Sequence, residues 1–427
     1  MVDVVNIKLW GEYVGAAIWD PKRQSAAFEF EESFVTKGLD ISPIMMPISN
    51  PRIFSFGDIS QRTFMGLPGL LADSLPDSYG RKLLDRWLAI SGRVVANPIE
   101  LLCFQGSRGM GALEFEPAQG LLSDTSKAIE ISTLIDIAQK ITSNKESLRA
   151  NFNDGNLKGG IEQVISVGTS AGGMRAKAVI AYNDETKEVR SGQVDADEGF
   201  EQWLLKLDGV TNNELGDPKH YGLIEYIYYL MARDAGIEMM ESRLLREGGR
   251  AHFMTKRFDR VGVNKKLHTQ TLCGLAHYDY RILRAYSYEQ LFEVMRRLRL
   301  PHSEARQMFR RMVFNIVTRN HDDHTKNVSF IMERGGKWRL SPAYDVTWAY
   351  SPMGSWTAMH QMSIGNRWDE FRRGDLAEFA SKINIKNYAE IIDQVVESVS
   401  HWGALSAEHE LPRSISTRLF NNFCMNL

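Results

Sequence analysis

Apolar residues recur at helical spacing between residues 304 and 319. Positions three and four apart share one face of a helix, so the pattern predicts a buried helix. Further on, apolar runs at 328–332 and 338–340 flank the turn-forming segment 333–337, which predicts a β-hairpin. The apolar face of the helix comprises Met308, Phe309, Met312, Val313, Ile316 and Val317.

Apolar and polar positions alternate from Val4 to Asp20. A period of two is typical of a strand with one buried face, and Gly11-Glu12 supplies a turn, so we expect a hairpin here. Its expected apolar face comprises Val5, Ile7, Leu9, Val14, Ala16 and Ile18.

Turn residues interrupt the segment 66–78, and a helical pattern follows it. Asp73 and Asp77 lie in this segment. Carboxylates at such positions cap the following helix, so we expect caps and turn residues rather than catalytic acids.

The middle of the chain predicts a second group of strands. Residues 164–167 and 178–182 flank a glycine-rich segment, 168–177, and two further strands are expected at 200–207 and 251–260. Helical patterns dominate from residue 291 onward, including 388–402 and an amphipathic segment at 413–427.

Composition and charge are those of a globular protein. The length of 427 residues predicts two or three packed lobes, and the hydrophobic content of 43% is typical of a globular protein. The net charge of −2 disfavours a broad nucleic-acid-binding surface. Cys103, Cys273 and Cys424 lie far apart without a C-x-x-C motif, which disfavours a disulfide framework or a zinc site. With no apolar stretch of about 18 residues and no leader pattern, a cytoplasmic protein is expected.

Between the helix and the hairpin, Asp322 precedes Asn327 by five positions. This D-x-x-x-x-N spacing occurs in phosphoryl-transfer loops, where the Asp orients the attacking hydroxyl and the Asn binds Mg²⁺. The predicted hairpin returns the chain so that Asp345 comes close to Asn327. The simpler interpretation is a solvated helix end capped by Asn320, and the hairpin together with Asp345 favours phosphoryl transfer over it.

The segment from Gly168 to Lys177 joins one strand to the next strand. Glycine-rich loops between strands cover phosphates in kinases, whereas a Walker loop leads into a helix. Arg175 and Lys177 add positive charge there. A tight turn without a ligand is the alternative interpretation.

Lys206 is the one lysine in the apolar strand 200–207. Burial of an unpaired ammonium group is unfavourable, so the residue is expected to bind the α- and β-phosphates of a nucleotide or to lie on an edge strand facing solvent. Glu225, near the start of the next predicted helix, is either its ion-pair partner or a surface residue.

With these segments placed, the sequence resembles the HipA family of serine/threonine kinases, the toxins of bacterial toxin–antitoxin pairs. The likeness spans most of the chain, and its matching segments occur in the expected order. They are the N-terminal hairpin with Leu-Pro-Asp at 75–77, Ser-Ala-Gly-Gly-Met-Arg-Ala-Lys at 170–177, Leu-Leu-Lys-Leu at 204–207, Lys-Arg-Phe-Asp-Arg at 256–260, Asp-Asp-His-Thr-Lys-Asn at 322–327 and Ser-Pro-Ala-Tyr-Asp-Val at 341–346.

The resemblance implies an α+β, bilobal, protein-kinase-like fold with a mixed α/β N-terminal region and a mainly helical C-terminal lobe. We divide the chain into an N-terminal subdomain (1–120), a helical connector (121–160), a nucleotide-binding lobe (161–260) and a catalytic lobe (261–427).

The resemblance also implies ATP and Mg²⁺ as cofactors. It makes Asp322 the general base, and Asn327 with Asp345 the Mg²⁺ ligands. The implied nucleotide-binding residues are Gly172, Gly173, Met174, Arg175, Ala176, Lys177, Lys206, Lys256, Arg257, Phe258, His324, Thr325, Lys326, Asn327, Tyr344 and Asp345.

In the family, the serine that begins the glycine-rich segment is a site of autophosphorylation that shuts the kinase off. Here that serine is Ser170, with Thr169 and Ser166 as neighbouring alternatives, or a serine used only for turn chemistry. The family further implies a protein substrate such as an aminoacyl-tRNA synthetase or another translation component. It also implies a small DNA-binding antitoxin of the HipB type, through which most contact with DNA would run.

Two positions depart from the expected pattern. Asp323 stands where a Gly is expected after the catalytic Asp, which adds negative charge beside the metal. Lys256 stands where an acidic residue is common at the adenine hinge, a change with little effect if the contact is made by backbone.

Two other functions are open at this stage. One is a metal-dependent phosphohydrolase with His321, Asp322, Asp323 and His324 as ligands, although four adjacent residues do not all converge on one ion. The other is a catalytically weak, nucleotide-sensing regulator that acts with a DNA-binding antitoxin.

Overall fold

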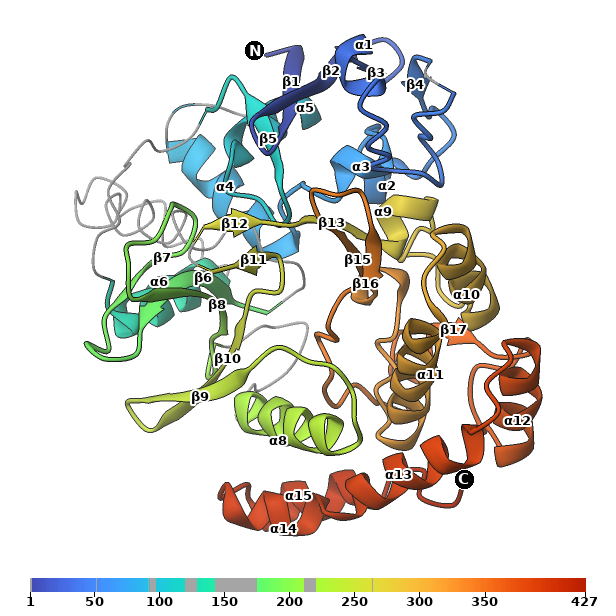
Figure 1. Cartoon of the computed structure of the whole chain (residues 1–427). Helices are drawn as coiled ribbons and strands as arrows, with labels where there is room; N and C mark the ends of the chain where they lie inside the picture. Colours follow the sequence, from blue (N-terminus) through green and yellow to red (C-terminus); the bar gives the residue numbers. More distant parts are fainter. Residues whose placement is uncertain are drawn as a thin grey trace. The chain divides into compact units, whose positions relative to one another are not determined.

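The structure is a computed structural model. It describes residues 2–50, 52–90, 92, 97–119, 129–142, 175–210, 220–262 and 264–427. The chain forms two compact units. The first comprises Met1–Ile41, Met46–Gly222 and Ser242–Thr269, and the second Ser42–Met45, Leu223–Glu241 and Gln270–Leu427. Each unit contains helices and strands, which confirms the α+β class (Figure 1).

The first unit begins with an antiparallel five-stranded sheet in the order β4-β3-β2-β1-β5. The predicted hairpin is confirmed as its strands β1 and β2. Short helices and α5 accompany the sheet. The elements are β1 (Val4–Leu9), β2 (Glu12–Asp20), β3 (Ser25–Phe30), α1 (Glu32–Val35), β4 (Phe54–Ser55), α2 (Gln61–Phe64), α3 (Gly69–Ala72), α4 (Ser78–Ile90), α5 (Pro98–Gln105) and β5 (Leu113–Glu116).

The predicted apolar face of β2 is wrong in its second half. Ile18 is 54% exposed, while Ala17 and Trp19 are buried. The side-chain alternation slips because Val14 and Gly15 are both buried, and the register with β1 shifts between Ile7 and Lys8. A Cβ on Gly15 would lie 2.1 Å from the Glu29 backbone oxygen, so close strand packing requires glycine there.

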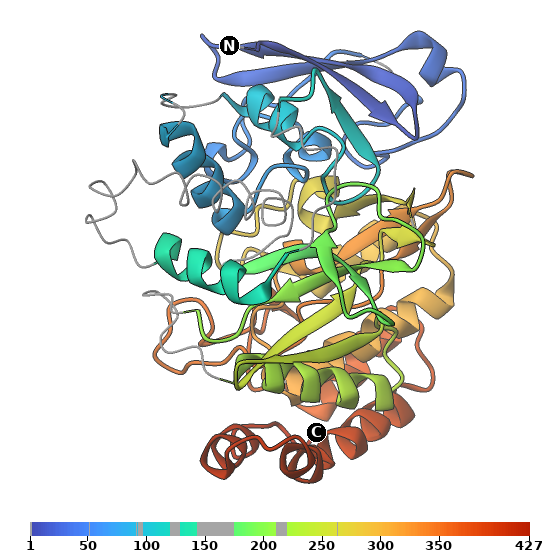
Figure 2. The same ribbon diagram turned by 90° about the vertical axis from the view of Figure 1, so that its left-hand side faces the viewer.

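The second sheet of this unit has the order β7-β6-β8-β10-β9. Helices α4 and α6 pack against it through one apolar cluster that includes Leu83, Leu134 and Trp203, and Figure 2 shows α6 along these strands. The elements are α6 (Ile131–Thr142), β6 (Lys177–Asn183), β7 (Val189–Ser191), β8 (Phe200–Lys206), β9 (Ser242–Glu247) and β10 (Arg250–Lys256), followed by β11 (Arg260–Val261), β12 (Lys265–Lys266) and β13 (His268–Thr271).

A fully buried carboxylate, Asp259, joins the loop after α5 to the end of β10 within the first unit. It accepts two hydrogen bonds from Arg257, at 2.9 and 2.7 Å, and one from the backbone N–H of Gly111 at 2.7 Å. Arg260 donates to it at 2.6 Å. Burial acts to raise the pKa of Asp259, but the two guanidinium groups hold it well below its usual range.

The second unit is mainly helical. Helix α11 was predicted over 304–319 and is observed over His302–Val317, with all six predicted apolar residues buried. The elements are α8 (Tyr221–Asp234), α9 (Leu272–Ala276), β14 (Tyr286–Ser287), α10 (Tyr288–Arg297), α11, the 3₁₀ turn η2 (Thr325–Asn327), β15 (Ser329–Met332), β16 (Trp338–Leu340), β17 (Met362–Ser363), α12 (Arg373–Lys382), α13 (Tyr388–Ser400), α14 (Trp402–Glu408) and α15 (Arg413–Phe420).

The hairpin predicted from 328 to 340 is confirmed. β15 and β16 are antiparallel, with Phe330 opposite Leu340 and Met332 opposite Trp338. All four of these side chains are buried. Both strands of the hairpin are therefore packed into the core of the unit through these side chains. Among the helices in the described ranges, none is both long and apolar enough to cross a membrane.

Replacing Asp259 with asparagine removes the charge that compensates two buried guanidinium groups. We expect Asp259→Asn to lower the free energy of unfolding by about 3–5 kcal/mol, seen as a lower Tm by circular dichroism. The control is Glu12→Gln, which removes the surface partner of Lys37 and should cost about 1 kcal/mol or less. Equal Tm values for the two variants would contradict the role given to Asp259.

Burial of His268 predicts a loss of stability in acid. The ring Nε2 lies 2.9 Å from the Ile41 oxygen, and burial lowers the pKa of His268 to about 4. Below about pH 6.5 the unfolded chain binds a proton that the folded chain does not, so stability falls as the pH drops from 6.5 toward 4, by about 3 kcal/mol in total. Urea unfolding at several pH values should show a shallower slope for His268→Gln. An unchanged slope would refute the assignment.

Candidate active site

The chain leaves α11 through a tightly bonded turn. The Tyr228 hydroxyl donates to the Thr318 oxygen at 2.6 Å, and the Asn320 backbone N–H donates to the Asn315 oxygen at 2.9 Å. Arg319 adopts a positive φ of 57°, which reverses the chain direction. These bonds present the residues after Asn320 from a rigid stem, so the segment is not the solvated helix end of the simpler interpretation.

Asp322 projects from this loop with its side chain 40% exposed. The Trp356 indole Nε1 donates to its Oδ1 at 2.6 Å, and His324 Nε2 lies 3.6 Å from the same oxygen. The second carboxylate oxygen, Oδ2, has no hydrogen bond from the part of the chain that the structure describes. Desolvation raises the pKa of Asp322, while His324 and the Trp356 hydrogen bond oppose that rise.

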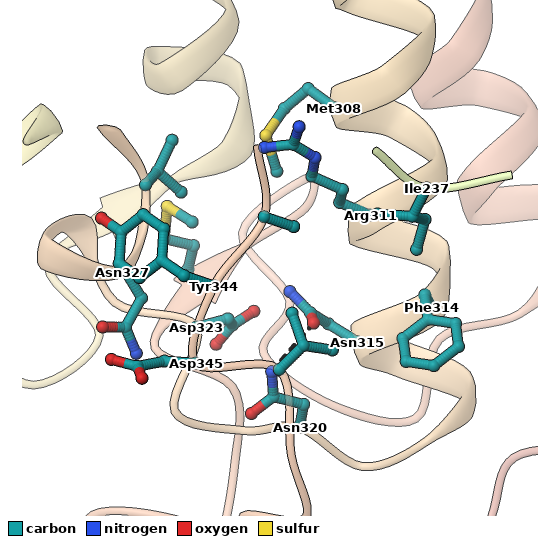
Figure 3. A pocket seen from close by; sticks show the side chains of 14 residues that line it. Ile237, Met308, Arg311, Phe314, Asn315, Asn320, Asp323, Asn327, Tyr344 and Asp345 are labelled. Carbon is teal, nitrogen blue, oxygen red and sulfur yellow. Dashed lines mark hydrogen bonds between the residues drawn. The ribbon is translucent and has the colours of Figure 1, made fainter. Parts of the chain in front are cut away.

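Asn327 and Asp345 lie together, as the hairpin predicts. In Figure 3 the polar ends of the two side chains point toward one another, and both line one cavity. The Asn327 Nδ2 donates to the backbone oxygen of Asp322 at 2.8 Å. A carbonyl oxygen only accepts, so this bond turns the amide oxygen of Asn327 the other way. An amide oxygen beside a carboxylate suits Mg²⁺, which prefers hard oxygen ligands.

Tyr344 lies in the loop that follows β16, next to Asp345. Its hydroxyl donates to the Lys326 oxygen at 2.8 Å and also bonds the Ser329 hydroxyl. Asp345 itself has a positive φ of 53°, a conformation that costs a non-glycine residue energy and persists where surrounding contacts impose it. The Tyr344 contacts therefore help to hold Asp345, with its strained backbone, beside Asn327.

Asp323 is turned inward rather than toward solvent, with 3% exposure. The Tyr288 hydroxyl donates to its Oδ2 at 2.8 Å, His360 Nδ1 lies 2.9 Å from the same oxygen, and the Gln361 N–H donates to Oδ1 at 2.7 Å. Burial acts to raise the pKa of Asp323, but His360 and these hydrogen bonds leave it lowered. The negative charge of Asp323, which was expected to lie beside the metal, is thus largely compensated by buried hydrogen-bond donors.

Residues that the sequence analysis did not select complete this site: Trp356, Tyr288, His360 and Gln361. They lie between 34 and 38 positions from their partners in the loop. No local pattern marks them, since a hydrogen bond across such a separation leaves no periodic signal.

A cavity of about 30 Å³ lies behind Asn327 and Asp345. That volume accommodates water and is much too small for a nucleotide. Arg311 of α11 lines it, and its buried Nε and Nη2 have no hydrogen-bond partner among the described residues. Burial lowers the pKa of Arg311 to about 10, so the side chain remains charged at neutral pH.

The remaining described candidates lie on the second sheet of the first unit. Lys177 and Lys206 are directly opposite one another on β6 and β8. Like charges in that arrangement repel, but Lys177 is buried and paired with Asp77 at 3.3 Å. Lys206 remains half-buried, with its Nζ 5.8 Å from the Phe253 ring centre. Lys206 is the more exposed of the two lysines, and its phosphate-binding role stays a prediction.

Asp77 also fulfils the expectation that it is a cap. Its Oδ1 accepts from the Gly80 N–H at 2.6 Å at the start of α4. Arg175, near the start of β6, stacks on Tyr221 with its guanidinium carbon 3.5 Å from the ring centre. Glu225 is buried in α8 of the second unit, and its proposed pairing with Lys206 stays a prediction.

At the expected adenine hinge, two side chains have partners inside the first unit. The Lys256 ammonium group donates to Glu201 at 2.7 Å, and the Arg257 guanidinium group forms an ion pair with Asp259. The Arg257 backbone N–H also donates to the Gln202 oxygen at 3.0 Å. Any hinge contact of Arg257 would therefore use its carbonyl group, and Phe258 is half-buried. Gly172, Gly173, Met174, Ser170, Thr169 and Ser166 lie outside the described residues.

The phosphohydrolase alternative requires a cluster of metal-binding side chains. Within the ranges that the structure describes, no group of three or more His, Cys, Asp or Glu residues is placed to hold a metal ion. Asp323 is enclosed by its own donors, and His321 is buried with its Nδ1 3.1 Å from the Thr357 oxygen. A two-ligand kinase-type site, completed by phosphates, does not need such a cluster.

Comparison with protein families agrees with this geometry. A model of the HipA-like C-terminal domain matches residues 169–402, and a model of the HipA N-terminal domain matches residues 5–116. The chain belongs to the HipA family. The C-terminal match includes all the candidate site residues, from Ser170 to Asp345. The N-terminal match covers the first sheet of this HipA-family chain.

Solved structures support the HipA-like fold. The HipA, HipB and operator DNA complex of the Shewanella oneidensis MR-1 toxin–antitoxin system matches at 19% identity and a TM-score of 0.69, covering 98% of this chain and 96% of that one. At this identity the likeness shows the fold alone. The Helicobacter pylori proinflammatory kinase CtkA matches at 12% identity over 52% of this chain and 91% of that one, with a TM-score of 0.33, too low to support an argument. No curated protein sequence matches this chain significantly.

Proposed function

We propose that this HipA-family protein is an ATP- and Mg²⁺-dependent protein serine/threonine kinase. The main support is the convergence of Asp322, Asn327 and Asp345 on one loop and hairpin of the second unit. The carboxylate of Asp322 has one oxygen held by Trp356 and the other directed to no described partner. That arrangement suits a group that accepts a proton from an attacking hydroxyl.

Asn327 and Asp345 would hold the Mg²⁺ that accompanies ATP. The bound ion would neutralise charge on the phosphates. Asn327 presents its amide oxygen because its nitrogen is bonded to the Asp322 backbone, and Asp345 is fixed next to it by the Tyr344 contacts. In this proposal the base and the metal ligands lie close together, and such positioning supplies a large part of the catalysis of phosphoryl transfer.

The proposed nucleotide contacts are those that the family resemblance implies. Lys206 would bind the α- and β-phosphates, and the segment 172–177 would cover them. Lys256 to Phe258 would meet the adenine, while His324 to Asn327 and Tyr344 would line the site. Support for Lys206 comes from its partial exposure on β8, whereas Lys177, opposite it on β6, is buried.

The alternative of a catalytically weak regulator gains little support. Such a protein has no need to keep Asp322, Asn327, Asp345 and Lys206 together with a hydrogen-bonded base. A kinase-like protein that has lost catalytic activity usually lacks one of these side chains, so the presence of all four favours an active kinase.

Substrate and partner follow from the family. We propose a role as a toxin in the cytoplasm, acting on a protein such as an aminoacyl-tRNA synthetase or another translation component. The Shewanella oneidensis structure contains HipB and operator DNA, so a HipB-type antitoxin is proposed as the partner. With a net charge of −2, DNA contact is expected to run mainly through that partner. A mobility shift of operator-like DNA by the chain alone would contradict this division.

Separate variants test the base and the metal ligands. We expect Asp322→Asn to reduce phosphoryl transfer from ATP by roughly 100- to 10,000-fold, because a general base is lost, with ATP–Mg²⁺ binding retained. Asp345→Asn should reduce transfer and weaken Mg²⁺-dependent ATP binding together. Label transfer and calorimetry measure the two effects. The control is Asp393→Asn, which removes an exposed partner of Arg373. Wild-type activity in Asp322→Asn would remove the base assignment.

Ser170 is the proposed site of self-phosphorylation. A phosphate dianion there would repel bound nucleotide phosphates and reduce activity. Intact-mass spectrometry after incubation with ATP and Mg²⁺ should show a gain of at least one phosphate in wild type and none in Asp322→Asn. Loss of the gain in Ser170→Ala identifies the residue, whereas persistence of the gain would move the site to Thr169, Ser166 or elsewhere.

A further inference from the structure

A closed set of hydrogen bonds connects the two adjacent aspartates through a segment 34–38 positions away. The Trp356 indole donates to Asp322 Oδ1 at 2.6 Å. The Gln361 side-chain Nε2 donates to the Trp356 backbone oxygen at 2.5 Å. The Gln361 backbone N–H donates to Asp323 Oδ1 at 2.7 Å. Since Asp323 follows Asp322 in the chain, these three hydrogen bonds and the backbone form a closed circuit.

We propose that Trp356 and Asp323 are positioning residues that fix the carboxylate of Asp322 for proton acceptance. The inference rests on the proposed kinase function and deepens it. Trp356 occupies Oδ1, which leaves Oδ2 as the oxygen that receives the substrate hydroxyl proton. Asp323 holds the segment that carries the indole, so it acts on Asp322 through Trp356.

The strength of the anchoring supports this division of roles. Asp323 accepts hydrogen bonds at both oxygens while it is 3% exposed. Bonds to an ionised group are shorter and stronger than neutral ones, and weak solvent screening strengthens them further. An isolated buried charge would be costly, so the donors around Asp323 must stay in place for the loop to keep its shape.

Other contacts join the same two segments. His321 Nδ1 lies 3.1 Å from the Thr357 oxygen, and the His321 and His360 rings are 4.1 Å apart, centre to centre. The segment 356–361 is thus attached at several neighbouring points to residues 321–323. A side chain on a segment held in this way has little freedom to rotate. The indole is therefore suited to fix the orientation of a carboxylate rather than only to cover it.

A competing explanation is that Trp356 only packs. Its ring lies 5.9 Å from that of His324, centre to centre. Phenylalanine would retain that aromatic contact but has no N–H. The two explanations therefore differ in what Trp356→Phe does to turnover.

The kinetic test uses the full-length chain with ATP and Mg²⁺, with ADP formation as the readout. We expect Trp356→Phe to lower kcat by roughly 10- to 100-fold, the effect of one hydrogen bond to a charged group. The KM for ATP should stay within about twofold, because no nucleotide contact is removed. The matched control is Trp368→Phe, since the buried Trp368 indole Nε1 has no hydrogen-bond partner among the described residues. Unchanged kcat in Trp356→Phe would overturn the proposal.

A double-mutant cycle tests whether Asp323 acts through Trp356. If the two residues belong to one circuit, Trp356→Phe combined with Asp323→Asn should lose about as much kcat as the worse single variant. Multiplicative losses would show independent roles and contradict the proposal. The thermal melt of Asp323→Asn checks its folding. If that variant does not fold, Gln361→Met, which removes the hydrogen bond to the Trp356 oxygen, replaces it in the cycle.

A spectroscopic readout separates failure of this inference from failure of the kinase function. In a ¹⁵N-labelled protein the Trp356 indole N–H signal, identified by its absence in Trp356→Phe, should lie downfield and move upfield in Asp322→Asn. The Trp368 signal should not move. Absence of ADP formation in the wild-type protein would contradict the proposed kinase function. An indole chemical shift that is unchanged in Asp322→Asn would contradict the positioning role, whether or not the protein is active.

Discussion

The buried carboxylate of Asp323 constrains the second unit more than any other single group in its active-site loop. It draws together a hydroxyl from α10, a ring nitrogen from His360 and a backbone N–H from Gln361. Each of these donors would lose a strong bond if the loop moved. These buried hydrogen bonds hold the loop that carries Asp322 in its observed arrangement. Asn327 follows in η2, and Asp345 comes after the hairpin of β15 and β16.

The first unit uses the same physical device for a different purpose. Asp259 is enclosed by Arg257, Arg260 and the N–H of Gly111, and it joins the N-terminal region to the strands that carry Lys206. A buried charge with all its partners in place is tolerated, whereas one that has lost a partner is costly. Asp259 and Asp323 thus each favour one local packing arrangement, because other arrangements would leave a buried carboxylate without its hydrogen-bond donors.

The chemistry expected at the active site depends on these supports. A carboxylate on a flexible loop would sample many orientations, and the proposed transfer needs its oxygen aimed at one hydroxyl. Charge-assisted bonds, a strained Asp345 and the Tyr344 contacts restrict the proposed base and metal ligands before any ligand arrives. The cavity that Arg311 lines together with Asn327 and Asp345 has room for water, so polar as well as apolar groups surround these two side chains.

The sequence by itself determined much of this protein. The period of apolar residues predicted α11, the hairpin of β15 and β16, and the N-terminal hairpin, because burial of one face imposes that period. The D-x-x-x-x-N spacing selected Asp322 and Asn327 as candidates, and the predicted hairpin placed Asp345 close to Asn327, with which it lines one cavity. These features are local, so neighbouring positions encode them.

Only the tertiary structure decided the rest. It placed Ala17 and Trp19 inside instead of Ala16 and Ile18, because a register shift against β1 at Ile7–Lys8 leaves Val14 and Gly15 both buried. It also turned Asp323 inward, paired Lys177 with Asp77, and brought Trp356 to Asp322. Such contacts join residues separated by tens of positions, and their energies come from burial and geometry that no short segment of sequence specifies.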